Sequence, residues 1–186
     1  MIPVELPQAL REYFESSPVA LSLGEAAGDH PLLLTNQRFR DLTGYATSEI
    51  VGQNCRFLQG NSDNQEARDR IHAFLGDDGQ ASVRTAIVNF RKDGSPFVNL
   101  LYMSKLRTLS GETRYIFASQ FDVSRTQPER LAQYDVALGQ AIARLAPVVA
   151  ESGIAVEGTL ITIANTAATI AQAKMTLADL DTSSFL

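Results

Sequence analysis

The sequence predicts an α+β fold, in which a five-stranded antiparallel sheet carries short helices on one face. Two observations predict it. The strand-like runs form two groups, two near the amino terminus and three after residue 80, and the short helical segments are grouped between them. Runs of strands with helices between them are typical of α+β domains, whereas parallel sheets alternate strand and helix. Such an arrangement leaves a pocket between the sheet and the helices.

The amino-terminal segment is expected to form a short amphipathic helix that caps the core. Within residues 4–17, apolar side chains recur at helical spacing: Leu6, Leu10, Tyr13 and Phe14. Two strands follow, over residues 19–23 and 31–36, and the intervening GEAAGDH has the glycine and aspartate residues of a turn. An opening β-hairpin is therefore expected.

The middle of the chain predicts several short helices, followed by three more strands. Segments 37–45 and 46–53 are each broken by a glycine, and a helix over residues 64–76 ends at a glycine. The strands are rich in β-branched and aromatic residues, and the turns RKDGSP and SGET separate them: residues 81–90, 97–109 and 114–124. Short turns of this kind predict an antiparallel meander.

The region after residue 126 differs in composition and is expected to form a helical hairpin. Pro128 suits a first helical turn, and one apolar stripe follows it: Leu131, Tyr134, Leu138, Ile142 and Leu145. Pro147 is expected to interrupt this helix. A second helix over residues 159–180 has mostly alanine and threonine outside its apolar face, so it needs to be covered.

Three interpretations of these carboxyl-terminal helices stay open: a hairpin folded onto its own sheet, a homodimer interface, and a DNA-binding helix-turn-helix. Apolar helices with uncovered surface favour the dimer interface. From Pro128 onward there are three basic residues against six acidic ones, a net charge of −3. A DNA-binding surface is basic, so that alternative is disfavoured.

Composition excludes other classes. A chain of 186 residues suits one domain with an accessory segment. A net charge of −5 argues against a binder of nucleic acid or acidic membranes. One cysteine cannot form an intramolecular disulfide, and the first residues lack the apolar run of a signal peptide. With no apolar window of about twenty residues either, a cytoplasmic protein is expected.

The most informative stretch is GQNCRFLQG at residues 52–60, which holds the one cysteine. It resembles the signature of the LOV (light, oxygen, voltage) photoreceptors, a flavin-binding branch of the PAS domains. The resemblance extends upstream to DLTGYATSEIVGQ and downstream to IVNFRKDGSPFVNL and IFASQFD. It divides the chain into a cap helix (1–17), a LOV domain with the PAS fold (18–123) and a carboxyl-terminal extension (124–186).

This resemblance implies a blue-light sensor in which Cys55 lies over a flavin ring. Light drives the flavin to a triplet, sulfur bonds to the C4a carbon, and the neighbouring N5 is protonated; the bond later breaks thermally. Because the photon supplies the driving force, the thiol needs no histidine partner, unlike a ground-state cysteine nucleophile. A photocycle is not net catalysis, so no enzyme is expected. Outside such a motif, a lone cysteine is more often a small buried apolar residue.

A flavin pocket needs apolar walls and a few amides, because the ring is a flat apolar body with a polar edge. By resemblance, Asn89 and Asn99 meet the pyrimidine edge and Gln120 lies near N5. Asn54 and Gln59 lie on the helix side. The candidates for the walls or their support are Leu21, Leu23, Phe57 and Leu58.

The flavin phosphate would be held by Arg56, since a guanidinium presents a fork of donors. LOV domains often carry a second phosphate-binding arginine after an isoleucine of the next helix. Here Ile71 is followed by His72, which takes that place among the candidate cofactor-binding residues, while Arg68 and Arg70 point elsewhere on a helix. FMN is expected, with riboflavin or FAD also able to occupy the site, and hence a mixed flavin content.

The output is expected to follow from Gln120, whose hydrogen bond must change when N5 gains a proton. Gln120 precedes Ser124, where the strand leaves for the extension, so the change can alter helix packing and the homodimer. Two alternatives stay open: a flavin redox sensor in which light is incidental, and a PAS interaction module without a chromophore. His30 and His72 are too far apart in the sequence to suggest a metal site. The downstream partner is not indicated.

Overall fold

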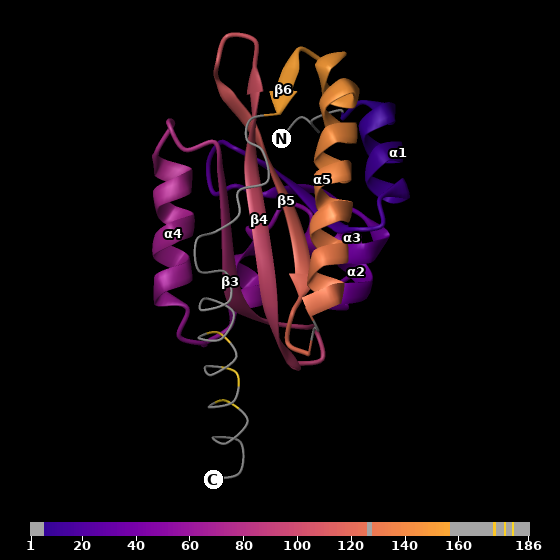
Figure 1. Ribbon diagram of the computed structural model, residues 1–186. Helices are drawn as coiled ribbons and strands as arrows, with labels where there is room; N and C mark the ends of the chain where they lie inside the picture. The colour runs from indigo at the N-terminus through magenta and orange to yellow at the C-terminus, as the bar shows by residue number, and fades with distance from the viewer. Residues whose placement is uncertain (1–5, 126–127, 157–172, 174–176, 178–179, 181–186) are drawn as a thin grey trace.

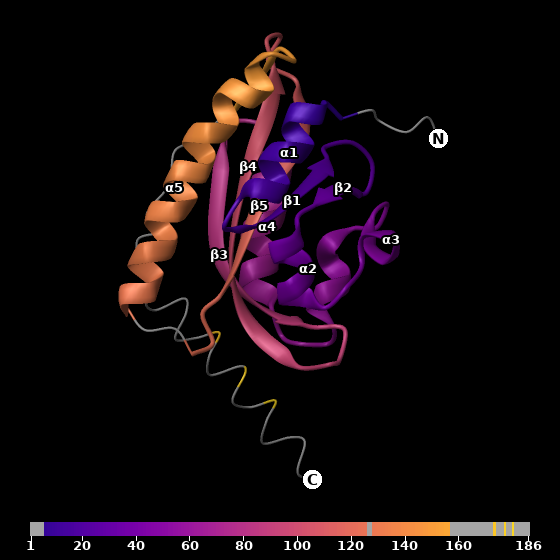
Figure 2. The ribbon, with the colours of Figure 1, turned by 90° about the vertical axis from the view of Figure 1, so that its right-hand side faces the viewer.

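One antiparallel sheet organises the structure, a computed structural model that describes residues 6–125 and 128–156 together with positions 173, 177 and 180. Five strands follow the spatial order β2-β1-β5-β4-β3; β3, β4 and β5 are labelled in Figure 1, and β1 and β2 in Figure 2. They are β1 (Ala20–Glu25), β2 (Leu32–Thr35), β3 (Ser82–Phe90), β4 (Pro96–Thr108) and β5 (Thr113–Asp122). The expected hairpin, meander and α+β class are confirmed.

Helices cover the two faces of the sheet unequally. Between β2 and β3 the chain forms α2 (Gln37–Thr43), α3 (Thr47–Ile50), the 3-10 helix η1 (Cys55–Gln59) and α4 (Gln65–Gly76). On the opposite face lies the long helix α5 (Pro128–Ala150), with α1 (Gln8–Ser16) beside it (Figure 2). The short helices therefore enclose one face, and the two terminal helices pack on the other.

Asn36 explains how the first hairpin, α1 and α2 are joined. Its Oδ1 caps α2 by accepting from the backbone N of Phe39 at 3.0 Å. Its Nδ2 donates to the carbonyl oxygens of Val19 and Phe14, at 2.7 and 3.0 Å. At the other end of α2, Gly44 adopts a φ of 78°, a left-handed conformation that favours glycine.

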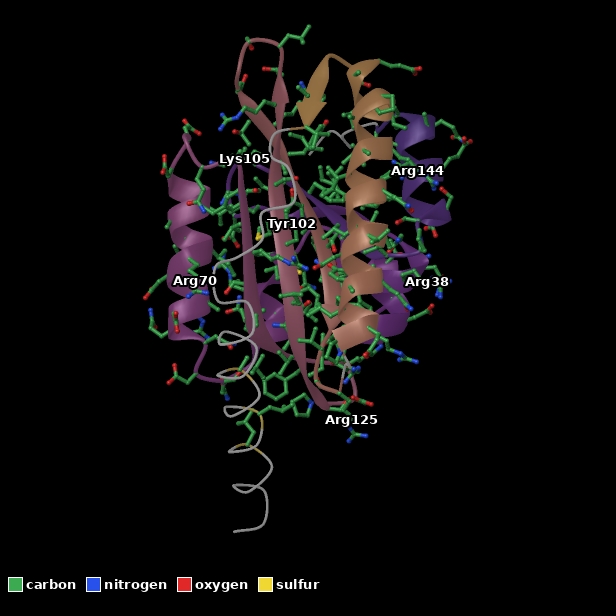
Figure 3. The ribbon with its side chains drawn as sticks, viewed as in Figure 1. Arg38, Arg70, Tyr102, Lys105, Arg125 and Arg144 are labelled. Atoms are coloured by element: carbon green, nitrogen blue, oxygen red, sulfur yellow. The ribbon has the colours of Figure 1, made fainter. Side chains whose placement is uncertain are left out.

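The larger apolar core lies between the sheet and the terminal helices. Phe14 of α1 meets Phe117 of β5 edge to face, with ring centroids 6.1 Å apart. Tyr102 of β4 is fully buried near the middle of this face (Figure 3). Leu138 and Leu145 of α5 are equally buried against the same cluster. Helix α5 is therefore docked on its own sheet, as the first of the three interpretations supposed for it.

Two features of the carboxyl-terminal region differ from expectation. Pro147 does not end α5, which continues to Ala150. A proline removes one helical hydrogen bond, but Leu145 and Val149, on either side of it, are buried against the core and hold the helix in place. A short strand that was not expected, β6 (Ile154–Val156), then pairs antiparallel with β4.

The second carboxyl-terminal helix, expected over residues 159–180, lies largely outside the described residues. Across the part of the chain that the structure describes, no helix combines the length and the apolar character that a bilayer crossing requires.

Candidate functional site

A pocket lies between the sheet and the short helices and contains about 720 Å³ of space free of protein atoms, part of it open to solvent. The apolar lining consists of Leu32, Ile71, Leu75, Ile87, Leu101, Met103, Ile116 and Ala118. The polar lining consists of Ser22, His30, Asn54, Arg56, Gln59, Asn89, Asn99 and Gln120, and Gly24 and Cys55 complete the wall.

Cys55 is held at the pocket wall by the start of η1. Asn54 caps this helix, its Oδ1 accepting from the backbone N of Arg56 at 2.9 Å. The Nδ2 of Asn54 donates to the carbonyl oxygen of Asp29 at 2.5 Å, and Asn54 forms an isolated β-bridge with Pro31. The cysteine backbone is thus tied to the β1–β2 turn.

The surroundings of Cys55 keep its thiol protonated. Burial raises the pKa of Cys55 from 9.0 to about 12, because a thiolate is poorly solvated there. The thiol is therefore a weak nucleophile at neutral pH, since the thiolate is the reactive form. Any reaction of this sulfur near pH 7 needs a driving force other than ground-state ionisation.

Asn89 and Asn99 form a pair of buried amides on neighbouring strands. The Nδ2 of Asn99 donates to Oδ1 of Asn89 at 2.9 Å, and its Oδ1 accepts from the backbone N of Phe121 at 3.2 Å. The Nδ2 of Asn89 donates to the carbonyl oxygen of Val88 at 3.1 Å. Each NH₂ group uses one of its two protons in these bonds, so both amides keep donor capacity at the pocket wall.

Two polar atoms at the pocket have no hydrogen-bond partner among the described residues: Oε1 of Gln120 and Nδ1 of His30. Both atoms are buried, and leaving a buried polar group unpaired costs about 1–3 kcal/mol. Nε2 of Gln120 does have a partner, Oγ of Ser22 on β1, at 3.1 Å. With the two asparagines, these atoms make the pocket suited to a ligand that has an apolar body and a polar edge.

Leu21 and Leu23 are not pocket walls, which corrects one expectation. Both belong to the core on the opposite face of the sheet, and the neighbouring Ser22 and Gly24 face the pocket instead. Side chains alternate along a strand, so an error of one position exchanges the faces. Residues 20–24 are all buried, so hydrophobicity did not reveal which face is which.

Leu58 supports the pocket without lining it. It is 1% exposed and packs in a small cluster beneath the short helices, together with Phe39 and Ile50. Phe57 packs against the same cluster and meets Tyr45 edge to face, with ring centroids 5.0 Å apart.

The candidate phosphate residues separate in space. Arg56 lines the pocket and forms an ion pair with Asp29, and both side chains are mostly exposed. Arg68 lies outside the lining, where Nε donates to Oε1 of Gln59 at 3.0 Å. His72 is exposed and does not line the pocket, which corrects its assignment. The preceding Ile71 points inward instead, because successive helical positions face different directions.

His30 is the main pocket residue that sequence reasoning missed. It lies in the β1–β2 turn with a φ of 51°, a left-handed conformation unusual for a residue other than glycine. The neighbouring Asp29 and Pro31 contact Asn54, so the turn reaches the pocket through tertiary contacts with the η1 region. No local sequence pattern signals such a contact.

Comparison with known proteins gives a consistent family. A profile of the PAS domain matches residues 19–125. The chain is 41% identical over 96 residues to a blue-light-activated histidine kinase of Brucella anthropi, covering 52% of this chain and 19% of that protein. It is 32% identical over 139 residues to blue-light-activated histidine kinase 2 of Erythrobacter litoralis, covering 74% of this chain and 40% of that one. The chain thus spans less than half the length of these relatives.

Solved structures agree with the sequence relatives. The crystal structure of the Rhodobacter sphaeroides LOV protein superposes with a TM-score of 0.69 and 28% identity, covering 93% of this chain and 91% of that one. The LOV domain of the Erythrobacter litoralis EL346 blue-light-activated histidine kinase gives a TM-score of 0.52 and 35% identity, over 57% and 96% of the two chains. The first of these similarities therefore extends well beyond the residues that match the PAS profile.

Proposed function

The chain belongs to the PAS domain family, in its LOV branch, and on that basis we propose that it is a blue-light photoreceptor that binds a flavin in the pocket beside Cys55. One observation carries the proposal: the cysteine and three buried amides line one pocket that also contains an unpartnered amide oxygen. A flavin ring needs this combination of apolar walls and amides.

When bound, a flavin would supply a blue-absorbing ring that, once excited, can take up both a sulfur atom and a proton. Cys55 supplies both the sulfur and the proton, and thermal reversal returns the proton to Sγ. The raised pKa of Cys55 supports this role, because a thiol that stays protonated at neutral pH retains the proton that must be transferred. It also keeps the sulfur unreactive in the dark.

Gln120 is proposed to sense the change in protonation. Its amide offers a donor in one rotation and an acceptor in the other, so it can match either state of the flavin edge. Ser22 accepts from Nε2 of Gln120 in the structure. A hydroxyl group both donates and accepts, so this contact between β1 and β5 can persist whichever way the amide points.

FMN is the proposed flavin, held at its phosphate by Arg56, whose guanidinium lies at the pocket wall. With His72 exposed, the following helix supplies no second arginine at that position. Asp29 already pairs with Arg56 and competes with a phosphate for it. This weakens the discrimination between FMN and the phosphate-free riboflavin, so mixed flavin content stays a prediction.

We further propose the three-part organisation of the chain: a cap over residues 1–17, the LOV domain over residues 18–123 and a signalling extension over residues 124–186, through which the protein forms a homodimer. A cytoplasmic location and a protein partner downstream belong to the same proposal. The apolar character of the extension supports the dimer. Light scattering in the dark and under blue light tests it, since an unchanged mass would contradict a light-dependent dimer.

Absorption spectroscopy with Cys55→Ala tests the photoreceptor and separates it from the redox alternative. The wild-type protein should show a structured blue band that bleaches on illumination and returns in the dark. The variant should keep the band and lose this bleaching and return. A response to chemical reduction that drives the same structural change in the Cys55→Ala variant would favour a redox sensor. A colourless wild-type protein would contradict flavin binding altogether.

A further inference from the structure

Tyr134 of α5 contacts both neighbours of Gln120 on β5. Ser119 and Phe121 point to the face opposite Gln120, as strand alternation requires. The Phe121 and Tyr134 rings are stacked, with centroids 4.1 Å apart and planes 8° from parallel. The hydroxyl groups of Ser119 and Tyr134 are hydrogen-bonded. The segment that carries the pocket amide is thus held by one side chain of the terminal helix.

The next residue on α5 provides a second attachment to the sheet. Asp135 forms an ion pair with Arg84 of β3, whose side chain is only 2% exposed. The Arg84 guanidinium carbon also lies 5.9 Å from the centroid of the Tyr134 ring. This turn of α5 is therefore attached to β5 through Tyr134 and to β3 through Asp135.

Elsewhere, α5 contacts the sheet through apolar packing. Its other buried residues are Leu138, Ala141, Leu145 and Val149. Such packing is not directional and tolerates small displacements. Among the described residues, one further polar contact to α5 comes from α1, where the Tyr13 hydroxyl donates to the carbonyl oxygen of Ala141 at 2.7 Å. Directional attachment to the sheet is thus concentrated at residues 134 and 135.

We propose that Tyr134 is the positioning residue through which a rearrangement at Gln120 reaches α5. The inference rests on the proposed function for its trigger, but the mechanical link between the two residues does not require light. A displacement of β5 at Gln120 moves Ser119 and Phe121 with it, because the three residues are consecutive. The hydrogen bond of Tyr134 to Ser119 and its stacking on Phe121 then change together. If both contacts weaken, the start of α5 is less firmly docked on the sheet; if both persist, it stays docked.

Burial keeps the phenol group of Tyr134 protonated. It raises the pKa of the Tyr134 phenol above its ordinary value of 10.0, because a buried phenolate is poorly solvated. The charged groups facing this ring are Arg84 of β3 and the adjacent Asp135 of α5. The phenol therefore remains a hydrogen-bonding partner of Ser119 across the neutral pH range, and the link does not depend on pH there.

A double-mutant experiment in the dark tests the link directly. Amide hydrogen exchange over residues 128–150, measured by mass spectrometry, reports how firmly α5 is docked. Gln120→Leu removes the amide and should raise exchange in α5 about fivefold, the effect of roughly one hydrogen bond. In a Tyr134→Leu background the same substitution should have no further effect on α5. Tyr134→Phe, which keeps the stacked ring, should restore part of the effect of Gln120→Leu.

Leu145→Ala is the matched control, because Leu145 is buried on α5 but more than two helical turns from Tyr134. Leu145→Ala should itself raise hydrogen exchange in α5 in the dark. Adding Gln120→Leu to it should raise that exchange further by the same factor as in the wild-type protein, because the effects of independent sites add. Equal effects of Gln120→Leu in the wild-type and Tyr134→Leu backgrounds would overturn the inference.

A second arm separates this inference from the proposed function. Blue light should raise exchange in α5 of the wild-type protein, and Tyr134→Leu should abolish that light-dependent difference while the bleaching and recovery of the blue band persist. A normal photocycle with an undiminished exchange difference in Tyr134→Leu would overturn the role of Tyr134 and leave the photoreceptor intact. Absence of any photocycle would overturn the photoreceptor, and the dark experiment would still decide the link.

Discussion

Nε2 of Gln120 on β5 donates to Oγ of Ser22 on β1, at 3.1 Å. Ser22 lies two positions along β1 from Ala20, the residue with which Gln120 pairs in the sheet. The contact joins the strand that continues toward the terminal helix to the strand that opens the domain. Oε1 of Gln120 has no partner among the described residues, so Ser22 provides the one hydrogen bond that the structure gives this side chain.

Ser22→Ala should lower the free energy of unfolding of the flavin-free protein by about 1–3 kcal/mol. It leaves Nε2 of Gln120 unpaired as well as Oε1, and both groups are buried. Urea denaturation measures the difference. Ser48→Ala, at an exposed position of α3, is the control and should change stability by less than about 0.5 kcal/mol. Equal effects of the two substitutions would show that the Gln120–Ser22 contact does not stabilise the fold.

Asn89→Leu should weaken flavin binding by roughly tenfold, the effect of losing about one hydrogen bond to the polar edge of the ring. Titration of the flavin-free protein, followed by flavin fluorescence, gives the dissociation constant. Asn61→Leu makes the same chemical change at an exposed position outside the pocket and should leave the constant unchanged. An unaltered affinity in Asn89→Leu would remove this residue from the proposed flavin contacts.

The thiol of Cys55 should react slowly with iodoacetamide in the folded, flavin-free protein. Its pKa is raised from 9.0 to about 12, so the thiolate fraction, and with it the rate, should grow about tenfold per pH unit up to that value. The same chain unfolded in urea should react on the order of a thousandfold faster at pH 8, with a rate that levels off above about pH 9. Equal rates in the folded and unfolded chains would contradict a desolvated thiol.

Gly60→Ala should destabilise the fold by more than about 1 kcal/mol. Gly60 follows η1 with a φ of 53°, and a Cβ there would lie 2.7 Å from Cδ2 of Phe90. Gly76→Ala is the matched control, because a Cβ at the end of α4 meets nothing within 4 Å. Thermal denaturation should show a lower midpoint for Gly60→Ala alone, and an unchanged midpoint would contradict the close approach of Gly60 to Phe90.

Much of the fold could be predicted because the strands of the meander are long and separated by short glycine-containing turns. The same regularity brought Asn89, Asn99 and Gln120 to one face, since their side chains point to the same side of adjacent strands. Cys55 could be assigned to the pocket only from the motif around it, because a single cysteine in a sequence does not otherwise differ from a buried structural cysteine.

The remaining features depend on tertiary contacts. Leu21 and Ser22 could not be assigned to faces, because both sides of β1 are buried. The role of His30 depends on the contact of its turn with the η1 region, and β6 is three residues long and is defined by its pairing with β4. Pro147 is tolerated because packing on either side of it stabilises α5, a contribution that local helix propensity does not include.

The most direct test of the central claim is the light-minus-dark infrared spectrum in the S–H stretching region, recorded with the blue absorption band on the same sample. Cys55 is the one cysteine of the chain, so any S–H signal is its own. An S–H band should be present in the dark, disappear under blue light and return at the rate at which the blue absorption recovers. An S–H band that stays unchanged while the blue absorption bleaches would contradict bond formation at Cys55.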